Sequence, residues 1–250
     1  MEVRCKYDGC CEFEAGSWNA TYCPTHGCKR KAEASKNRLL KPIIEYDEEA
    51  WQLEENRKIA RVRRRSEKNK WILRTKKIVM FDIETSNLSA DIGEMLCACT
   101  KPLGGDITTL VATRAGDKKL AKALQEELSK ADYICGHYAT RFDVPFLNTR
   151  LLVHNKPLLS MYRLIDTYFP AKFKLRLHSN RQGSIAELMF GKTIKTRVVG
   201  PIWTKALRGD KASMQYIIEH CQADVTELEA IFVEMAEAGL LNLSEVGLRL

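Results

Sequence analysis

One apolar run in this 250-residue chain contains a carboxylate near its end and is followed directly by a second one. The run KIVMFDI (77–83) is rich in β-forming residues and predicts a buried strand. Asp82 and Glu84 are separated by one residue, so the period of two places both side chains on the same face. Burial of a carboxylate in an apolar strand costs free energy unless the carboxylate is paired with a partner of opposite charge or a hydrogen-bond donor. The two acidic residues therefore predict a functional site on this face of the strand.

Further apolar runs and amphipathic stretches follow this strand and indicate one α/β domain over residues 77–250. We expect strands at 94–100, 106–113, 132–137 and 163–169, and helices at 117–131, 142–154, 185–190 and 211–239. Gly104-Gly105 favours a hairpin. The order predicts a mixed sheet flanked by helices, with an early antiparallel meander and later strands that enter through helical crossovers.

Three more polar side chains lie beside apolar stretches later in the chain. His220 and Asp224 are four residues apart on the expected last helix, so they share one of its faces. Asp143 opens an earlier helix and can serve as a ligand or simply as a cap. His220 alone is more typical of a satisfied surface histidine, so the argument depends on the combination. Carboxylates brought together repel one another, which makes two divalent metal ions the most economical explanation. Such a site indicates a nuclease or another phosphoryl-transfer enzyme.

The segments FDIET (81–85), FDVPFL (142–147) and HCQAD (220–224) resemble the three exonuclease motifs of the DEDD 3′–5′ exonuclease superfamily. The resemblance covers roughly residues 77–238 and implies the ribonuclease H-like fold. Within that superfamily the chain looks like the predicted exonucleases related to the proofreading domain of family B DNA polymerases, many of them from phages or bacteria. The tracts LIDTYF and LRLHSNRQGSIAELMFG extend this resemblance.

The resemblance implies a role for each motif residue. Asp82 would bridge two Mg²⁺ or Mn²⁺ ions, and Glu84 and Asp224 would complete one metal site. Glu84 would also contact the terminal 3′-hydroxyl, and Asp143 would hold the second ion, partly through water. His220 would orient or deprotonate the attacking water, because an imidazole has a pKa near neutrality. One ion lowers the pKa of bound water and the other stabilises the leaving oxygen.

Two positions depart from the family's pattern. Relatives place either a tyrosine three intervening residues before the last Asp or a histidine four intervening residues before it, and His220 stands at the tyrosine spacing. Relatives often have Asn five positions before the Asp of the second motif. This chain has Tyr138 there, which can stack on a base or simply pack. Asp166, at the end of an expected strand, is a further candidate or a turn cap.

Cysteines distinguish the first 31 residues. The pairs Cys5-x4-Cys10 and Cys23-x2-His26 predict a zinc knuckle with one structural Zn²⁺, similar to those of phage DNA-associated proteins. Cys28 can replace His26, and Cys11 can replace Cys10. The alternative is a disordered tail with reduced thiols. The later cysteines, Cys97, Cys99, Cys135 and Cys221, have apolar neighbours and are interpreted as core residues.

Residues 32–76 predict a basic helical linker with a break at Pro42. Residues 1–77 contain 19 Lys/Arg and 12 Asp/Glu, a net charge of +7, whereas residues 78–250 contain 21 and 20, a net charge of +1. A solvated helix face is the alternative, but so one-sided a run indicates contact with phosphates. The residues expected to bind nucleic acid are Tyr138, Arg61, Arg63, Arg64, Arg65, Lys68, Lys70 and Trp71, the last of which can instead anchor the helix.

The complete expectation is a metal-dependent 3′–5′ exonuclease that acts on single-stranded or 3′-ended DNA, with RNA as an alternative. We expect no membrane association, because there is neither an apolar signal region nor a run of eighteen apolar residues. A cytoplasmic location in a bacterium or a phage-infected cell follows, with a replication or repair protein as a partner. A structure-selective endonuclease and a nucleic-acid-binding adaptor with an inactive nuclease domain are the alternatives.

Overall fold

The structure is a computed structural model that describes residues 2–5, 12–14, 28–29, 33, 48–194, 196 and 198–249. Contacts divide the chain into two units, Met1–Arg57 and Lys58–Leu250. The finer division into 1–31, 32–76 and 77–250 stays a prediction. Within the described residues, no helix has the length and apolar character needed to cross a membrane.

The first unit contains a small β-hairpin. Strands β1 (Glu2–Arg4) and β2 (Glu12–Glu14) pair in an antiparallel register. Cys5 directly follows β1 and is buried, and Cys28 is buried as well. Helix α2 (Glu48–Thr75) begins in this unit and ends in the second one.

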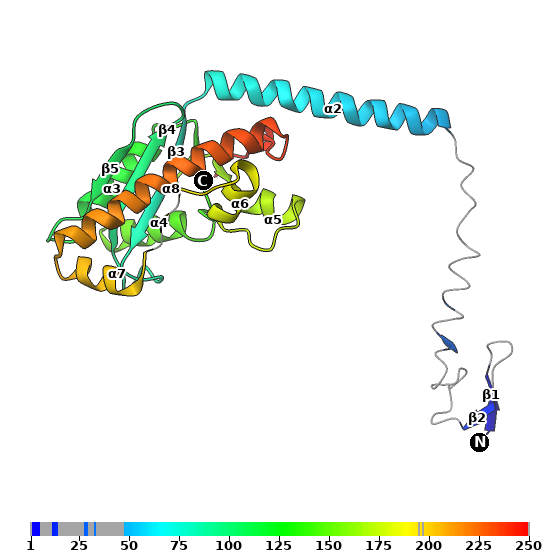
Figure 1. Cartoon of the computed structure of the whole chain (residues 1–250), viewed down its shortest axis with the longest axis horizontal. Coiled ribbons are helices and arrows are strands. Elements are labelled where there is room, and N and C mark those ends of the chain that lie inside the picture. Colours follow the sequence, from blue (N-terminus) through cyan, green and yellow to red (C-terminus); the bar gives the residue numbers. More distant parts are fainter. Residues whose placement is uncertain are drawn as a thin grey trace. The chain divides into compact units, whose positions relative to one another are not determined.

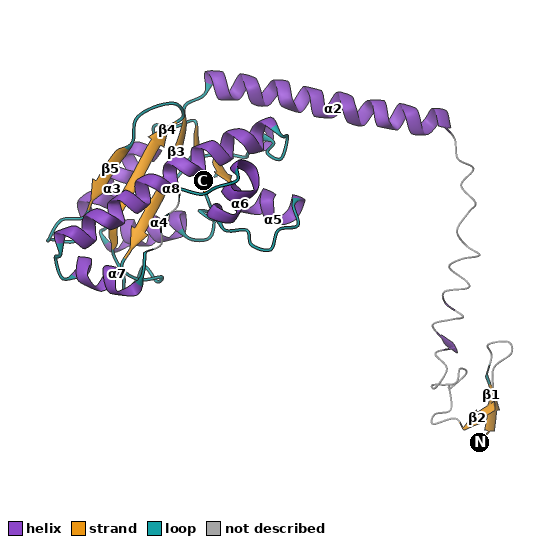
Figure 2. Ribbon diagram, in the orientation of Figure 1, coloured by secondary structure: helices purple, strands orange, loops and turns teal. Residues whose placement is uncertain are grey.

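A five-stranded mixed sheet forms the centre of the second unit (Figures 1 and 2). Its strand order is β5-β4-β3-β6-β7. The strands are β3 (Ile78–Thr85), β4 (Met95–Pro102), β5 (Thr108–Val111), β6 (Tyr133–Gly136) and β7 (Leu164–Asp166). The first three form an antiparallel meander, whereas β6 and β7 run parallel to β3. The predicted mixed sheet with helical crossovers is therefore confirmed.

Helices cover both faces of the sheet. They are α3 (Lys118–Leu128), α4 (Asp143–Val153), α5 (Tyr168–Lys174), α6 (Gln182–Phe190), α7 (Gly200–Leu207) and α8 (Lys211–Glu237), followed by the 3₁₀ turn η1 (Leu243–Glu245). The expected strand 163–169 is wrong in its second half, because β7 stops at Asp166 and α5 begins two residues later. The Asp166 carboxylate accepts a hydrogen bond from the Tyr168 amide at 3.0 Å, which turns the chain at this point.

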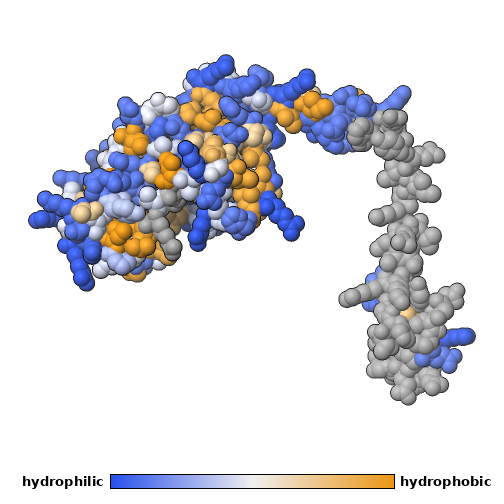
Figure 3. All heavy atoms as spheres, viewed as in Figure 1, coloured by the Kyte–Doolittle hydropathy of each residue, from blue (hydrophilic) through white to orange (hydrophobic). Residues whose placement is uncertain are grey.

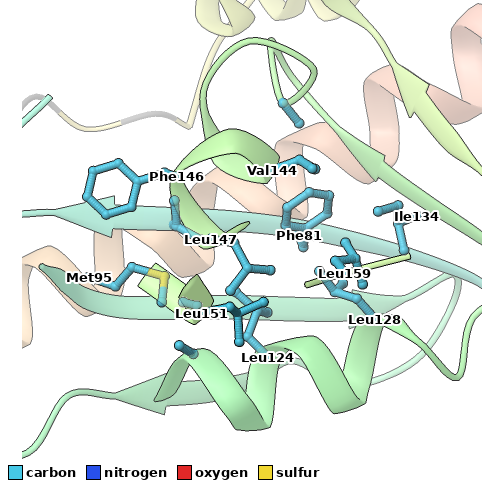
Figure 4. Packing of buried hydrophobic residues seen from close by; sticks show 14 of the residues in the cluster. Phe81, Met95, Leu124, Leu128, Ile134, Val144, Phe146, Leu147, Leu151 and Leu159 are labelled. Atoms are coloured by element: carbon cyan, nitrogen blue, oxygen red, sulfur yellow. The ribbon is translucent and has the colours of Figure 1, made fainter. Parts of the chain in front are cut away.

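Alternate residues of β3 pack into two hydrophobic layers. Val79, Phe81 and Ile83 face α3 and α4, and Figure 4 shows Phe81 among leucines such as Leu124 and Leu147. The intervening residues face the layer formed by α6 and α8. This alternation decides which side chains of β3 reach α8.

The buried side-chain amide of Asn69 holds the C-terminal part of α2 within the second unit. Asn69 Nδ2 donates hydrogen bonds to the backbone oxygens of Ala236 and Leu241, both at 3.0 Å. Its Oδ1 accepts one from the Leu243 amide at 3.1 Å. Together with the buried Ile72, these bonds position the basic residues of α2 beside η1.

Candidate metal centre

β3 carries two carboxylates on the face of the sheet that α8 covers. Ile78 and Met80 occupy that face and are buried in the cluster that includes α6 and α8 residues. Asp82 and Glu84 continue the same series and are half-buried, whereas Ile83 between them belongs to the opposite cluster. One face of the strand therefore changes from apolar to acidic while the other stays apolar.

Helix α8 supplies a second pair of polar side chains. Its apolar stripe, which includes Ile217, Cys221 and Leu228, is buried against the sheet. His220 and Asp224 lie one turn apart beside this stripe and are only 8% and 3% exposed. The packing that buries the stripe thus brings an imidazole and a carboxylate to the end of β3.

The imidazole of His220 lies between two carboxylates. Its Nε2 is 3.6 Å from Glu84 Oε1 and 3.7 Å from Asp224 Oδ2. One ligand atom from each of these three residues lies within 4.8 Å of the others. The separations exceed those of a direct hydrogen bond. Atoms at this spacing can all contact one ion or one water molecule placed between them, because bonds of about 2.1 Å hold ligand atoms roughly 3–4 Å apart.

The other ring nitrogen of His220 is held by a loop. Thr196 Oγ1 lies 2.8 Å from His220 Nδ1. Glu227 fixes the preceding residues to α8, because its Oε1 accepts hydrogen bonds from the Thr193 hydroxyl at 2.6 Å and the Ile194 amide at 2.9 Å. The Nδ1 contact orients the ring so that Nε2 faces the carboxylates.

Asp143 contacts β3 between its two carboxylates. It is the first residue of α4 and is 5% exposed. Its Oδ1 accepts a hydrogen bond from the backbone amide of Ile83 at 3.3 Å. Asp143 therefore lies beside the candidate centre as well as in the first turn of its helix. Glu84, His220 and Asp224 thus come together at the end of β3, whereas Asp82 and Asp143 lie beside this group, on β3 and at the start of α4, and are not part of it.

Buried thiols lie beneath the acidic face. In the sheet register Cys99 is opposite Asp82 and Cys97 is opposite Glu84, while Cys221 Sγ lies 3.5 Å from the backbone oxygen of Asp82. Hydrogen bonds with Cys97 and Cys99, together with burial, raise the pKa of Cys221 well above its usual value. Cys221 therefore stays a protonated packing group. The interpretation of the four later cysteines as core residues is confirmed by their burial.

A groove of about 440 Å³ opens beside Glu84. The loop after β3 forms one wall, and Phe142 and Trp203 supply aromatic side chains from the segments next to α4 and within α7. Leu88, also in the wall, is 84% exposed. The groove thus combines one carboxylate, that of Glu84, with aromatic and aliphatic side chains.

The other predicted nucleic-acid contacts lie on exposed surfaces. Tyr138 is 42% exposed and packs edge to face with Tyr168. The side chains of Arg61, Arg63, Arg64, Lys68, Lys70 and Trp71 are exposed along α2, and Arg65 is half-buried. Four of these basic residues line a pocket of about 180 Å³ with Asn242, Ser244 and Glu245: Arg61, Arg64, Arg65 and Lys68.

The predicted zinc ligands are described only in part. Cys5 and Cys28 are buried, at 8% and 1% exposure. Cys10, Cys11, Cys23 and His26 lie outside the described residues. Burial of two thiols in the first unit is consistent with ligands, and the zinc knuckle stays a prediction.

Sequence reasoning missed Thr196 and Glu227. Thr196 belongs to an irregular loop, and nothing in its local sequence predicts contact with a helix residue 24 positions later. Glu227 did carry a signal. It is a charged residue three positions after Asp224, on the buried side of α8, where a solvated glutamate is not expected.

Comparisons with known proteins agree with this architecture. No curated protein matches the chain. Among solved structures, the family B DNA polymerase from the hyperthermophilic archaeon Pyrobaculum calidifontis is similar, with a TM-score of 0.58 and 15% sequence identity. The match covers 68% of this chain but only 27% of the polymerase chain, and at this identity the likeness concerns the fold. Residues 79–236 match the family model described as the RNase_H superfamily. Because that model spans more than half of its length, this chain belongs to the RNase_H superfamily.

Proposed function

We propose that this protein is a metal-dependent 3′–5′ exonuclease acting on single-stranded DNA. Membership in the RNase_H superfamily supports nuclease activity in general. The observation that carries the proposal is the cluster of Glu84, His220 and Asp224, whose ligand atoms lie within 4.8 Å of one another. Asp82 and Asp143 adjoin this cluster through β3 and its backbone contact.

The donor set fits hard divalent cations. Glu84 and Asp224, with Asp82, are the proposed ligands of one ion, and Asp82 with Asp143 those of a second. Carboxylate oxygens are the ligands that Mg²⁺ and Mn²⁺ prefer. Bound ions would activate a water molecule and stabilise the leaving oxygen of a phosphodiester.

The residues of the chain would position the reactants. His220 Nε2 faces the space between Glu84 and Asp224, so it is placed to take a proton from the attacking water. The hydroxyl of Thr196 holds the opposite ring nitrogen and keeps this orientation. The groove beside Glu84 would receive the terminal nucleotide, with Phe142 and Trp203 available to contact its base.

Basic residues would hold the rest of the substrate. Four basic residues, Arg61, Arg64, Arg65 and Lys68, outnumber the single carboxylate of Glu245 in the pocket beside η1, so this pocket would attract a phosphate group. The predicted zinc knuckle would bind the nucleic acid as well. Metal analysis of protein purified without chelators tests this part, and absence of zinc would refute the knuckle.

The central test is degradation of labelled single-stranded DNA. Asp82→Ala is expected to abolish Mg²⁺-dependent shortening from the 3′ end, because it removes the ligand shared by both ions. Glu126→Gln is the matched control, since Glu126 is an exposed carboxylate on α3. Circular dichroism verifies that both variants fold. Full activity of Asp82→Ala would refute the proposal.

Substrate geometry separates the alternatives. An exonuclease leaves circular single-stranded DNA intact, whereas a structure-selective endonuclease opens it. Labels at each end of a linear strand give the direction of degradation, and parallel RNA substrates decide the sugar preference. Absence of cleavage with either Mg²⁺ or Mn²⁺, with binding retained, would indicate an adaptor with an inactive nuclease domain.

A further inference from the structure

Four aromatic rings, two exposed and two half-buried, gather near the end of β7. They belong to Tyr138 in the β6–α4 loop and to Tyr168, Phe169 and Phe173 of α5, and together we call them the aromatic platform. Tyr138 is 42% exposed and Phe173 is 75% exposed. Figure 3 shows hydrophobic surface at the end of the domain where Figure 1 places α5. We propose that the aromatic platform binds unpaired bases of a single-stranded nucleic acid.

The rings of the platform form a continuous series. Tyr138 and Tyr168 have centroids 4.7 Å apart at 66°, and Tyr168 and Phe169 have centroids 5.3 Å apart at 86°. Phe169 and Phe173 are nearly parallel, at 18°, with centroids 6.2 Å apart. These contacts support the rings against one another while Phe173, the outermost, stays open to solvent. Supported aromatic faces of this kind are the surfaces on which unpaired bases stack.

One carboxylate holds the two halves of the platform together. Asp166 Oδ1 accepts hydrogen bonds from the amides of Tyr138 at 2.9 Å and Tyr168 at 3.0 Å. Its Oδ2 accepts one from the Thr140 amide at 2.9 Å. These bonds hold Tyr138 at φ 66°, a left-handed conformation that is costly for a bulky residue. A strained, half-exposed tyrosine held in this way is typical of a functional position.

The charge around the platform favours a polyanion over an apolar protein partner. Residues 167–186 contain no Asp or Glu but four basic residues, Lys172, Lys174, Arg176 and Arg181. Lys172 Nζ lies 5.7 Å from the ring centre of Tyr168 and 6.0 Å from that of Phe173. Positive groups beside aromatic faces match a strand in which phosphates alternate with bases.

The platform adjoins the end of β7, which lies two strands away from β3 and its carboxylates. β3, β6 and β7 are parallel, so their carboxyl ends meet one edge. Neighbouring strands are about 4.8 Å apart, which places β7 roughly 10 Å from β3. A stacked strand rises about 3.4 Å per nucleotide, so about three nucleotides cover this distance. The inference rests on the proposed function for its substrate and makes that substrate unpaired, because bases inside a duplex already stack on one another.

The test compares two labelled strands of equal length and charge, an oligothymidylate and an abasic strand. Fluorescence anisotropy is recorded without Mg²⁺ or Mn²⁺ and without a chelator, so that neither strand is cut and a structural Zn²⁺ stays bound. The oligothymidylate should bind at least about 10-fold more tightly than the abasic strand. Phe173→Ala should remove about 10-fold of the affinity for the oligothymidylate and leave that for the abasic strand unchanged.

Two further variants make the result specific. Leu152→Ala removes a similarly exposed apolar side chain at the far end of α4, and it should change neither affinity. Lys172→Gln should lower the affinity for both strands equally, since it removes a positive charge that would contact phosphates. Equal affinities of the wild type for the two strands would overturn the inference. So would a dimer that Phe173→Ala dissociates, because the rings would then cover a second copy of the chain.

Failure of the inference and failure of the proposed function are distinguishable. The effect of Phe173→Ala on base-dependent binding reports only on the platform, whereas loss of cleavage in Asp82→Ala reports only on the metal centre. A nuclease without base-dependent binding keeps the proposed function and loses the platform. Base-dependent binding that Phe173→Ala weakens, without any cleavage by the wild type, supports the platform and refutes the proposed function.

Discussion

Asp117 and Asp224 are both buried carboxylates, but their surroundings differ. Asp117 is fully buried, and the side chains of Arg150 and His154 both donate to it. Asp224 is 3% exposed and shares the imidazole of His220 with Glu84. Two basic side chains thus serve one carboxylate at the first position, and one imidazole serves two carboxylates at the second. The first charge is stabilised by the fold, whereas the second cluster is suited to a cation from solution.

The contacts of Asp117 join three elements. Arg150 donates from Nε to Oδ2 at 2.8 Å and from Nη2 to Oδ1 at 2.9 Å. His154 Nε2 lies 2.6 Å from Oδ1, and the Met95 amide donates to Oδ2 at 2.9 Å. The carboxylate therefore ties α4 and the start of β4 to α3. A fully hydrogen-bonded set of this kind indicates a structural role.

The largest effect on stability is expected at Asp117, because its partners are side chains of the folded protein. Asp117→Ala should lower the free energy of unfolding by about 3–5 kcal/mol, because the Arg150 guanidinium would stay buried without its carboxylate. Urea denaturation at neutral pH measures this loss. Glu126→Ala, an exposed change on the same helix, should stay within about 0.5 kcal/mol of the wild type. A loss below about 1 kcal/mol for Asp117→Ala would mean that the pair is not structural.

The opposite pattern is expected at the candidate metal centre. Asp224→Asn should reduce Mg²⁺-dependent cleavage at least about 100-fold, because it replaces a metal ligand at nearly constant shape. The same change relieves repulsion with Glu84, so stability in EDTA should be unchanged or higher.

Thermal denaturation with and without Mg²⁺ checks the second half of this prediction. Added Mg²⁺ should raise the melting temperature of the wild type more than that of Asp224→Asn, since an ion that binds only the native state stabilises it. Destabilisation of Asp224→Asn in EDTA would place Asp224 in the same class as Asp117.

Much of the fold could be predicted from the sequence because its elements have strong periodicity. β3, α3 and α8 lie within a few residues of their expected bounds. The failure at α5 has a specific cause. The tract after Asp166 has strand-forming residues, but the Asp166 carboxylate accepts hydrogen bonds from the amides of Tyr138, in the loop after β6, and Tyr168, at the start of α5, and these bonds end the strand.

The candidate site also has a part that the sequence predicts and a part that it does not. Pairs on regular elements, such as Asp82 with Glu84 and His220 with Asp224, follow from the periods of a strand and a helix. Thr196 does not, because a loop residue is placed by tertiary contacts alone. Asp117 was expected only as a helix start, and its partner Arg150 lies 33 residues away on α4. The local sequence predicts how the candidate ligands are spaced on one element. It does not predict which distant residues, such as Thr196, form hydrogen bonds with them.

A smaller effect is expected from the support of His220. Thr196→Val keeps the size of the side chain and removes its hydroxyl, so the imidazole loses the contact that orients it. Cleavage should fall about 10-fold, with a displaced pH profile of kcat. Thr196→Ser retains the hydroxyl and should restore both. Loss of activity without any change in the pH profile would indicate that Thr196 only supports the loop.

The smallest effect is expected in acid. Burial acts to raise the pKa of Asp117, but hydrogen bonds from Arg150, His154 and the Met95 amide outweigh it and hold that pKa below its usual value of 3.8. A carboxyl group with a lowered pKa stabilises the native state fully above pH 3.8, and this contribution is lost as the pH falls through its folded-state pKa. Denaturation midpoints of the wild type should therefore fall more steeply below pH 3.8 than those of Asp117→Asn. Parallel pH dependence of the two proteins would mean that Asp117 titrates alike in the folded and unfolded chain, which its contacts with Arg150 and His154 oppose.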